Sequence, residues 1–174
     1  YRVSGQSTQH QGVIPDIQYP DVMNTKEIGE SALPEAMPWD SIRPAIKPEL
    51  DPIKPFLAEL QSRFETRTAS NPDFAFARER LALATRLMDE KTVSLNEDTR
   101  RKQQADIEAQ QLAIENNRRE AKGETILTEL KEEDEDVAAA ELEDKTKPQD
   151  DAFLAESGHI LLDYLNLNTH LAKQ

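Results

Sequence analysis

The first twenty residues constrain the fold of this chain more than any other stretch, because their composition favours β-structure and the rest does not. Residues 1–3 form a short strand-prone run that Ser4 and Gly5 can turn. Residues 13–19 supply β-branched and aromatic side chains, with Pro15 confined to an edge or a bend. Two strands bury too little apolar surface in water to offset the entropy lost on ordering them. This hairpin is therefore expected to belong to a larger sheet, and the chain to a longer protein.

The apolar content of the chain limits the core that it can build. Its 174 residues allow one ordinary domain, or a small domain with a tail. Only 37% of them are hydrophobic and 5% aromatic, whereas 32% are charged, so the core is expected to be thin. Cysteine is absent, which excludes a disulfide framework and a thiolate site. No apolar run reaches about 18 residues, and we predict no membrane insertion.

The charge balance narrows the classes of partner. The formal net charge is -13 at pH 7. Nucleic acid and anionic membrane surfaces bind clustered lysine and arginine, so neither is expected as a partner. A basic protein partner stays open.

Residues 23–52 are predicted to form an extended connector. Five prolines in this stretch each remove a backbone donor and bias the preceding residue away from helix. The connector also holds the only tryptophan, Trp39, whose large side chain is expected to be buried beside Met37 and Ile42 as an anchor on a neighbouring surface. Contact with a ligand is the alternative. The prolines are Pro34, Pro38, Pro44, Pro48 and Pro52.

Two amphipathic helices are predicted after the connector, each with a cap and a proline at its start. Asp51-Pro52 precedes the first helix, and Asn71-Pro72 begins the second. Apolar side chains recur at three- and four-residue spacing on both, which places one face of each in the core and favours an antiparallel hairpin across residues 66–70. The core positions are Ile53, Phe56, Leu57, Leu60 and Phe64 on the first helix, and Phe74, Ala77, Leu81, Ala84 and Met88 on the second.

A third helix is predicted from residue 96 to about residue 122, after a short strand or extended link at residues 92–95. It is rich in strong helix formers, Asn96 or Asp98 can cap its start, and Gly123 can end it. Its few apolar residues do not keep a heptad repeat, which argues against a coiled coil. We expect a largely solvated helix packed along one edge of the domain.

The C-terminal part divides into an acidic loop and an apolar helix. The like charges of residues 132–136 and their surroundings cannot bury enough apolar surface to order, so a mobile acidic loop is predicted near residues 130–148. Residues 148–151 supply a cap and first-turn acids for a final helix, which is predicted to close the core against the first two helices. Its core-facing side comprises Phe153, Leu154, Ser157, Ile160, Leu161, Tyr164, Leu165 and Leu171.

No catalytic, cofactor-binding or metal-binding constellation is predicted within the chain. Four serines near the N-terminus lack the strand-turn-helix glycine context of a nucleophile, and the sequence has no glycine-rich phosphate loop. Charged residues are dispersed along helix faces, whereas an active site concentrates them in a cleft. The serines are Ser4, Ser7, Ser31 and Ser41.

The histidines and the acidic run are weak candidates for a site. His10, His159 and His170 have no second histidine at metal-ligand spacing. His159 and Asp163 can meet across one helical turn, which is typical of a surface contact. Residues 132–136 lack the glycine and the spacing of a calcium loop, so a solvated acidic segment is the favoured interpretation.

The start of the chain resembles the segment that closes the protease domain of the carboxyl-terminal processing peptidases. The similarity lies in Tyr1-Arg2, residues 4–7, Gln9, Gly12-Val13 and Pro15-Asp16-Ile17. It is specific over about residues 1–45 and at residues 93–96. Further on, Gly29-Glu30, residues 36–42 and residues 93–96 resemble the long bacterial branch of that family, the periplasmic tail-specific proteases.

The resemblance implies a periplasmic parent enzyme that degrades or trims envelope proteins from their C-terminal ends with a serine nucleophile and a lysine base. Both catalytic residues would lie upstream of Tyr1, so this chain alone would be neither an enzyme nor a binder of cofactors. The implied partners are protein substrates and an envelope adaptor protein.

The implied fold class is mainly α, with an N-terminal β-hairpin as the remnant of the protease domain. Residues 1–22 would be the terminal strands of that domain, residues 23–52 the connector, and residues 53–174 a C-terminal domain of about four helices.

An independent acidic helical interaction module is the alternative function. Its apolar helix faces would recruit a partner, and its acidic loop would discourage wrong ones. The two hypotheses differ in whether residues 1–19 need an upstream protease domain in order to be ordered.

Overall fold

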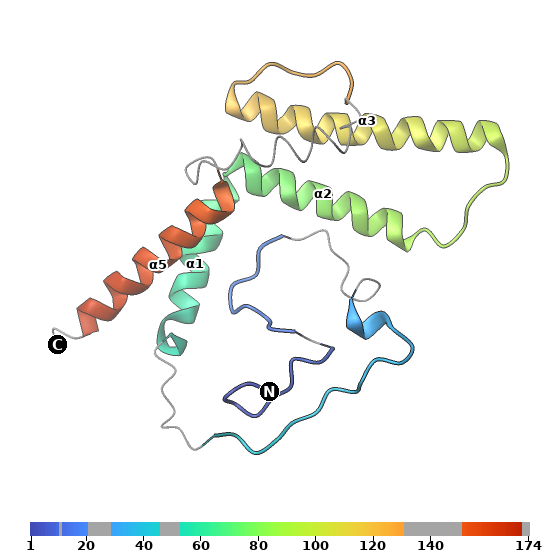
Figure 1. The fold of residues 1–174 in the computed structure, drawn as a ribbon. Coiled ribbons are helices and arrows are strands. Elements are labelled where there is room, and N and C mark those ends of the chain that lie inside the picture. The colour runs from blue at the N-terminus through green and yellow to red at the C-terminus, as the bar shows by residue number, and fades with distance from the viewer. Residues whose placement is uncertain (11, 21–28, 46–52, 131–150, 172–174) are drawn as a thin grey trace, which may run out of the picture. The chain divides into compact units, whose positions relative to one another are not determined.

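The computed structural model describes residues 1–10, 12–20, 29–45, 53–130 and 151–171, with side chains up to residue 169 in the last range (Figure 1). The described chain is mainly α, as the sequence predicts. The acidic loop predicted near residues 130–148 lies almost wholly outside the described residues. The elements, in order, are the 3-10 turns η1 (Glu30–Ala32) and η2 (Lys54–Phe56) and the helices α1 (Leu57–Ala69), α2 (Pro72–Asp89), α3 (Glu97–Lys122) and α5 (Ala152–Leu171).

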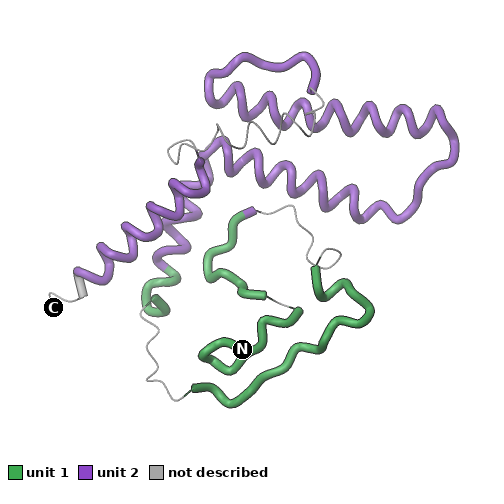
Figure 2. The backbone as a smooth tube through the Cα atoms, viewed as in Figure 1, with its two compact units in different colours: residues 1–19, 23–58 green, residues 20–22, 59–174 purple. Residues whose placement is uncertain are grey.

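The chain divides into two compact units (Figure 2). The N-terminal unit comprises Tyr1–Tyr19 and Met23–Ala58, and the helical unit comprises Pro20–Val22 and Glu59–Gln174. The whole of the predicted connector, residues 23–52, therefore falls in the N-terminal unit. The four described α-helices fall in the helical unit, apart from the first two residues of α1.

Backbone pairing between the first residues and the connector organises the N-terminal unit, and the predicted hairpin is not seen. Gln6 and Ser41 form an isolated antiparallel bridge. The amide of Ile42 donates to the carbonyl of Gly5 over 2.8 Å. Residues 13–19 form no strand. A two-stranded hairpin is only marginally stable, whereas the proline-restricted connector offers an extended backbone that loses less entropy on pairing.

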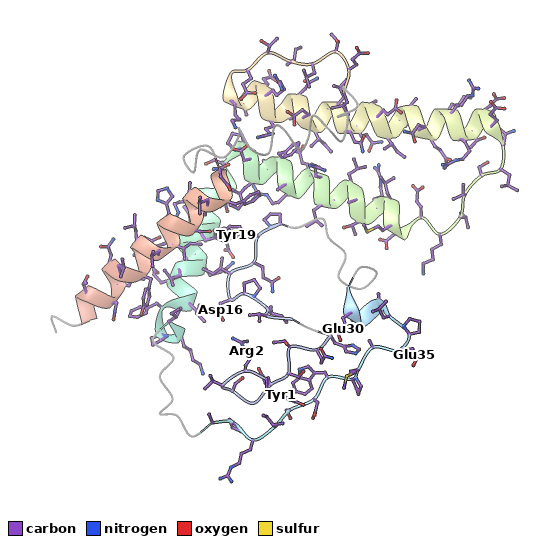
Figure 3. All side chains as sticks on the ribbon, viewed as in Figure 1. Tyr1, Arg2, Asp16, Tyr19, Glu30 and Glu35 are labelled. Carbon is purple, nitrogen blue, oxygen red and sulfur yellow. The ribbon has the colours of Figure 1, made fainter. Side chains whose placement is uncertain are left out.

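Gly5 is the residue that this pairing constrains most. Its φ of 81° lies in the left-handed region, and a Cβ atom at this position would lie 2.1 Å from the carbonyl oxygen of Ile42. Glycine alone permits such an approach of two backbones. In the same unit lies Tyr1 (Figure 3). Its hydroxyl donates to the Asp40 carboxylate over 2.9 Å, and this hydrogen bond raises the pKa of Tyr1.

The predicted burial of Trp39 is not seen within the chain. Trp39 is 42% exposed, and Met37 and Ile42 are also exposed. The connector pairs with the first residues through backbone atoms, a mode of contact that requires no burial of its side chains. That Trp39 anchors the connector on a neighbouring surface stays a prediction.

The helix boundaries follow the capping signals of the sequence. Asn71 accepts hydrogen bonds from two backbone amides at the start of α2, at 2.9 and 3.3 Å. Asn96 caps α3 by accepting from the Thr99 amide over 3.0 Å. Gly123 ends α3 with φ 73°, and its amide donates to the carbonyls of the last turn. These contacts satisfy donors and acceptors that a helix end leaves unpaired.

α2 and α3 form an antiparallel pair in the helical unit (Figure 1). Arg118, near the end of α3, donates to Asp73 in the first turn of α2 over 2.7 Å, and Arg86, near the end of α2, donates to Gln110 over 2.5 Å. No residue of α3 is buried, which confirms a solvated helix along one edge. The predicted antiparallel hairpin of α1 and α2 is wrong, because α2 takes α3 as its lateral neighbour and meets α1 chiefly at their junction.

An aromatic cluster forms the core where α1, α2 and α5 meet. Phe74 is fully buried, and its ring packs edge-to-face on Phe64 and Phe153, with centroid separations of 5.8 and 4.9 Å. Leu60 and Leu83 are the other buried apolar side chains that the structure describes in this unit. The core is thin, as the composition predicts.

α5 is rotated from its predicted orientation. Leu161 and Leu165, which were expected in the core, are 57% and 47% exposed, whereas Glu156 is only 6% exposed. Phe153 alone among the large predicted core residues joins the aromatic cluster. The reason is that arginines on α1 draw the carboxylates of α5 inward.

We predict that Phe74→Ala lowers the free energy of unfolding by about 3–5 kcal/mol, the usual cost of deleting a buried aromatic ring. Leu161→Ala, at an exposed position of α5, is expected to change it by no more than about 0.5 kcal/mol. Urea unfolding of the two variants and the parent chain measures both values. Similar losses in the two variants would show that the aromatic cluster is not the core.

Candidate functional site

Two arginines of α1 face two carboxylates of α5. Arg63 and Arg67 are four residues apart, one helical turn, and Glu156 and Asp163 are seven residues apart, two turns. Each spacing places its two side chains on one face of a helix. We call these four residues the charged junction.

Arg67 lies at the centre of the charged junction. Its Nε and Nη2 atoms donate to Oε1 of Glu156 over 2.9 and 2.6 Å, and Nε also reaches Oε2 over 3.1 Å. Its Nη1 atom donates to Oδ2 of Asp163 over 2.5 Å. Arg63 Nη1 donates to the other oxygen of Asp163 over 2.9 Å, and Arg63 Nε donates to Glu59 over 2.7 Å. The network therefore joins two helices that lie far apart in the sequence.

The hydrogen bonds of the charged junction favour the ionised forms of Asp163 and Arg67. Burial alone would raise the pKa of Asp163, but the hydrogen bonds from Arg63 and Arg67 outweigh it and hold that pKa below its ordinary value. The hydrogen bond to Glu156 raises the pKa of Arg67. The side chains of Glu156 and Asp163 are 7% and 16% exposed, so both carboxylates need a partner.

The arrangement of the charged junction fits a structural role rather than a catalytic one. A general acid or base needs a pKa near the working pH and a proton-transfer partner, whereas the charged junction moves the pKa of Asp163 away from neutrality. Each arginine is shared between two carboxylates. The junction fixes the rotation and the register of α5 on α1.

A second charged cluster joins the start of α2 to the end of α3. Burial would raise the pKa of Asp73, but hydrogen bonds from Arg118 at 2.7 Å and Lys122 at 3.3 Å outweigh it and lower that pKa. The guanidinium groups of Arg118 and Arg80 lie 4.8 and 5.4 Å from the centre of the Phe76 ring. These cation–π contacts extend the cluster along α2.

The segment after α3 is fastened back onto that helix by a side-chain amide. Asn116 Nδ2 donates to the Leu127 carbonyl over 2.9 Å, and the Leu127 amide donates to Asn116 Oδ1 over 2.7 Å. Arg119 Nε donates to the Thr125 carbonyl over 2.7 Å. The sequence alone gave no sign of this clasp, because an asparagine inside a helix is usually solvated.

The serines considered as nucleophiles are spread over the N-terminal unit. Ser7 accepts a hydrogen bond from the Gln9 amide over 3.0 Å, a turn contact. Ser4, Ser31 and Ser41 are exposed. That the chain holds no catalytic residue stays a prediction.

The histidines are not brought together. His10 has φ 62°, and its Nε2 atom is buried without a hydrogen-bond partner among the residues that the structure describes. His159 is exposed on α5, and Asp163 pairs with the arginines of α1 instead. The side chain of His170 and residues 132–136 lie outside the described part. Within that part, no three histidine, cysteine or acidic side chains gather where they could hold a metal ion.

The sequence interpretation missed the charged junction. Asp163 was considered only as a partner of His159, and Arg63, Arg67 and Glu156 were not singled out. One signal was available, since Glu156 and Asp163 are the acidic residues inside the most apolar helix of the chain. A carboxylate on a helix that is otherwise apolar indicates a buried ion pair.

The comparisons with known proteins give the family. Residues 23–166 match the family model described as the C-terminal domain of tail specific protease (DUF3340). The chain belongs to this family. A protein of Haemophilus influenzae named Tail-specific protease is 30% identical over 172 residues, a stretch that covers 97% of this chain and 23% of that protein.

The chain thus spans about a quarter of the length of the curated relative that it matches. Its family match begins in the connector, runs through α1, α2 and α3, and ends within α5. Among the described residues, no helix combines the length and apolarity needed to cross a membrane.

We predict that Arg67→Ala lowers the free energy of unfolding by about 2–4 kcal/mol, because it leaves the buried carboxylate of Glu156 without its partner. The matched control is Arg101→Ala. Arg101 pairs with Glu97 within α3, where both side chains are more than three-quarters exposed, and its loss is expected to cost at most about 0.5 kcal/mol. Urea unfolding measures both, and equal effects would contradict a structural role for the charged junction.

The lowered pKa of Asp163 predicts a dependence of stability on acid. Its carboxylate stabilises the fold above the unfolded-state pKa of about 3.9, and this contribution is lost as the pH falls through the lower folded-state value. The stability difference between the parent chain and Asp163→Asn is therefore expected to be constant above about pH 5 and to shrink below about pH 4. Urea unfolding across this range measures it. A difference that is the same at every pH would rule out the ion pair as its source.

Proposed function

We propose that this chain is the non-catalytic C-terminal domain of a periplasmic serine endopeptidase that degrades or processes proteins from their C-terminal ends. The match of residues 23–166 to the C-terminal domain of tail specific protease carries this proposal. The serine nucleophile and the lysine base would then lie in the part of the relative's length that this chain does not span. The substrates of the parent enzyme would be proteins.

The proposed domain division rests on the sequence and differs from the two compact units, which place residues 1–19 and 23–58 together. Residues 1–22 would be the terminal strands of the protease domain, residues 23–52 a connector, and residues 53–174 the helical domain. The pairing of residues 5–7 with residues 40–42 supports a connector that stays close to the end of the protease domain.

The proposed role of the helical domain is mechanical. The charged junction and the aromatic cluster hold α1, α2 and α5 in one arrangement. A framework of this kind supports a protease fold, walls a substrate chamber or receives an adaptor protein of the cell envelope. The ionised groups of the charged junction are committed to one another rather than to a reactive centre.

We predict that the isolated chain hydrolyses no peptide bond, because the proposal places the serine nucleophile and the lysine base outside this chain. The measurement is incubation with an unfolded protein that ends in an apolar C-terminus, followed by mass spectrometry of the products. The full-length parent serves as the positive control. Turnover that survives rigorous purification of the isolated chain would refute the proposal.

A parent protein that lacks residues 53–174 tests the supporting role. Its melting temperature and its rate of cleavage are both expected to fall, since the protease domain loses a packed neighbour. A truncated enzyme that is as stable and as active as the complete one would contradict a supporting domain.

A further inference from the structure

α5 has a second face that the charged junction does not use. Four leucines on it are about half exposed, at 51% for Leu154, 57% for Leu161 and Leu162, and 47% for Leu165. Their spacing of seven, one and three residues places them on one stripe of the helix, opposite Glu156 and Asp163. We call these four residues the leucine face.

The burial of apolar and acidic side chains on α5 is the reverse of that on a typical surface helix. A helix that packs on one neighbour normally buries its leucines and leaves its carboxylates in water. α5 instead buries Glu156 and exposes the leucine face. Contiguous exposed apolar surface of this kind marks a contact surface.

Gly158 lies in the middle of the leucine face, four residues after Leu154 and three before Leu161. Glycine destabilises a helix interior relative to alanine, so its presence there calls for a reason. A Cβ atom at this position would meet nothing within 4 Å in the structure. No contact inside the described chain therefore requires a glycine, whereas close approach of another backbone to the leucine face would.

The size of the leucine face points to its occupant. Four half-exposed leucines present on the order of 400 Å² of apolar surface, about half of the 800 Å² that each partner buries in a stable interface between separate proteins. A second copy or a free partner would gain too little from this face alone. A segment of the same polypeptide needs less area, because covalent linkage supplies a high effective concentration.

We propose that the leucine face of α5 docks an apolar helix from the part of the protease polypeptide that this chain does not span, with Gly158 at the point of closest approach. The relative of Haemophilus influenzae is long enough to supply it, since this chain covers 23% of that protein. The inference rests on the proposed function as one domain of a longer protease. It adds which surface of the domain faces the remainder of the enzyme.

Thiol footprinting of the full-length parent tests this proposal. The chain contains no cysteine, so Leu161→Cys places a single thiol of known position within it. The probe is iodoacetamide, and mass spectrometry of the peptide that contains residue 161 gives the alkylation rate in native protein and in urea. Docking is expected to slow native alkylation at least about tenfold relative to urea, because a covered thiol reacts only through local opening.

The matched control is Arg101→Cys on α3, a helix that does not carry the leucine face. The side chain of Arg101 is 78% exposed, and its cysteine is expected to react in the native parent at close to its rate in urea. Adding Gly158→Leu to the Leu161→Cys parent is expected to restore most of the alkylation, because the new side chain keeps the docked helix away.

Three results would overturn the proposal. The first is native alkylation of Leu161→Cys as fast as in urea. The second is equal protection of both cysteines, which would mean that the leucine face is not selected. The third is protection that disappears on dilution, which would identify a second copy as the occupant. None of these readouts uses peptide cleavage, so a parent without protease activity would refute the proposed function and leave the footprint interpretable.

Discussion

The bidentate contact of Arg67 with Glu156 is the interaction on which the helical unit depends. The side chain of Glu156 is 7% exposed, and burying a carboxylate without a partner is costly, so the packing of α5 in this position depends on Arg67. Arg67 also reaches Asp163, two turns further along α5, and this second contact fixes the direction of the helix as well as its rotation. Ion pairs with such geometry add little net stability, but they exclude alternative packings.

The aromatic cluster and the charged junction both position α5, each through a different kind of contact. Phe153 packs on Phe74 near the start of α5. This apolar contact alone does not fix the rotation of the helix. The charged junction then selects one rotation, and it is the rotation that leaves the leucine face in water. In this arrangement α5 buries Glu156 and leaves four leucines about half exposed.

The parts of this fold that the sequence predicts correctly are those fixed by contacts between residues close together in the sequence. The helix ends are predicted by capping residues that contact residues at most four positions away, namely Asn71, Asn96 and Gly123. The rotation of α5 and the choice of α3 as the neighbour of α2 depend on residues far apart in the sequence. Apolar periodicity shows which face of a helix is buried, but it does not show which neighbouring helix that face contacts. The same holds for the N-terminal unit, where the segment from Gly5 to Ser7 pairs with residues of the connector rather than with the nearer residues 13–19.

The candidate site was less predictable than the fold, for a physical reason. Arginines and carboxylates on helices are usually solvated, so Arg63 and Arg67 look like ordinary surface residues until α5 is placed over them. Family resemblance predicted the family of the chain because it rests on exact residues, such as those of positions 93–96, rather than on pattern. It carried no information on which side chains hold the helices together.

The sequence separation of its contacts gives the helical unit an order of assembly. Phe64 and Phe74 meet across ten residues, and the contacts between α2 and α3 span 24 to 49 residues, whereas α5 is joined to α1 by contacts that span 89 to 100 residues. The entropy of closing a loop rises with its length, so contacts between distant residues form late in folding. α5 is therefore the last helix to arrive, and a nascent domain carries its aromatic cluster open on one side until synthesis has delivered Phe153.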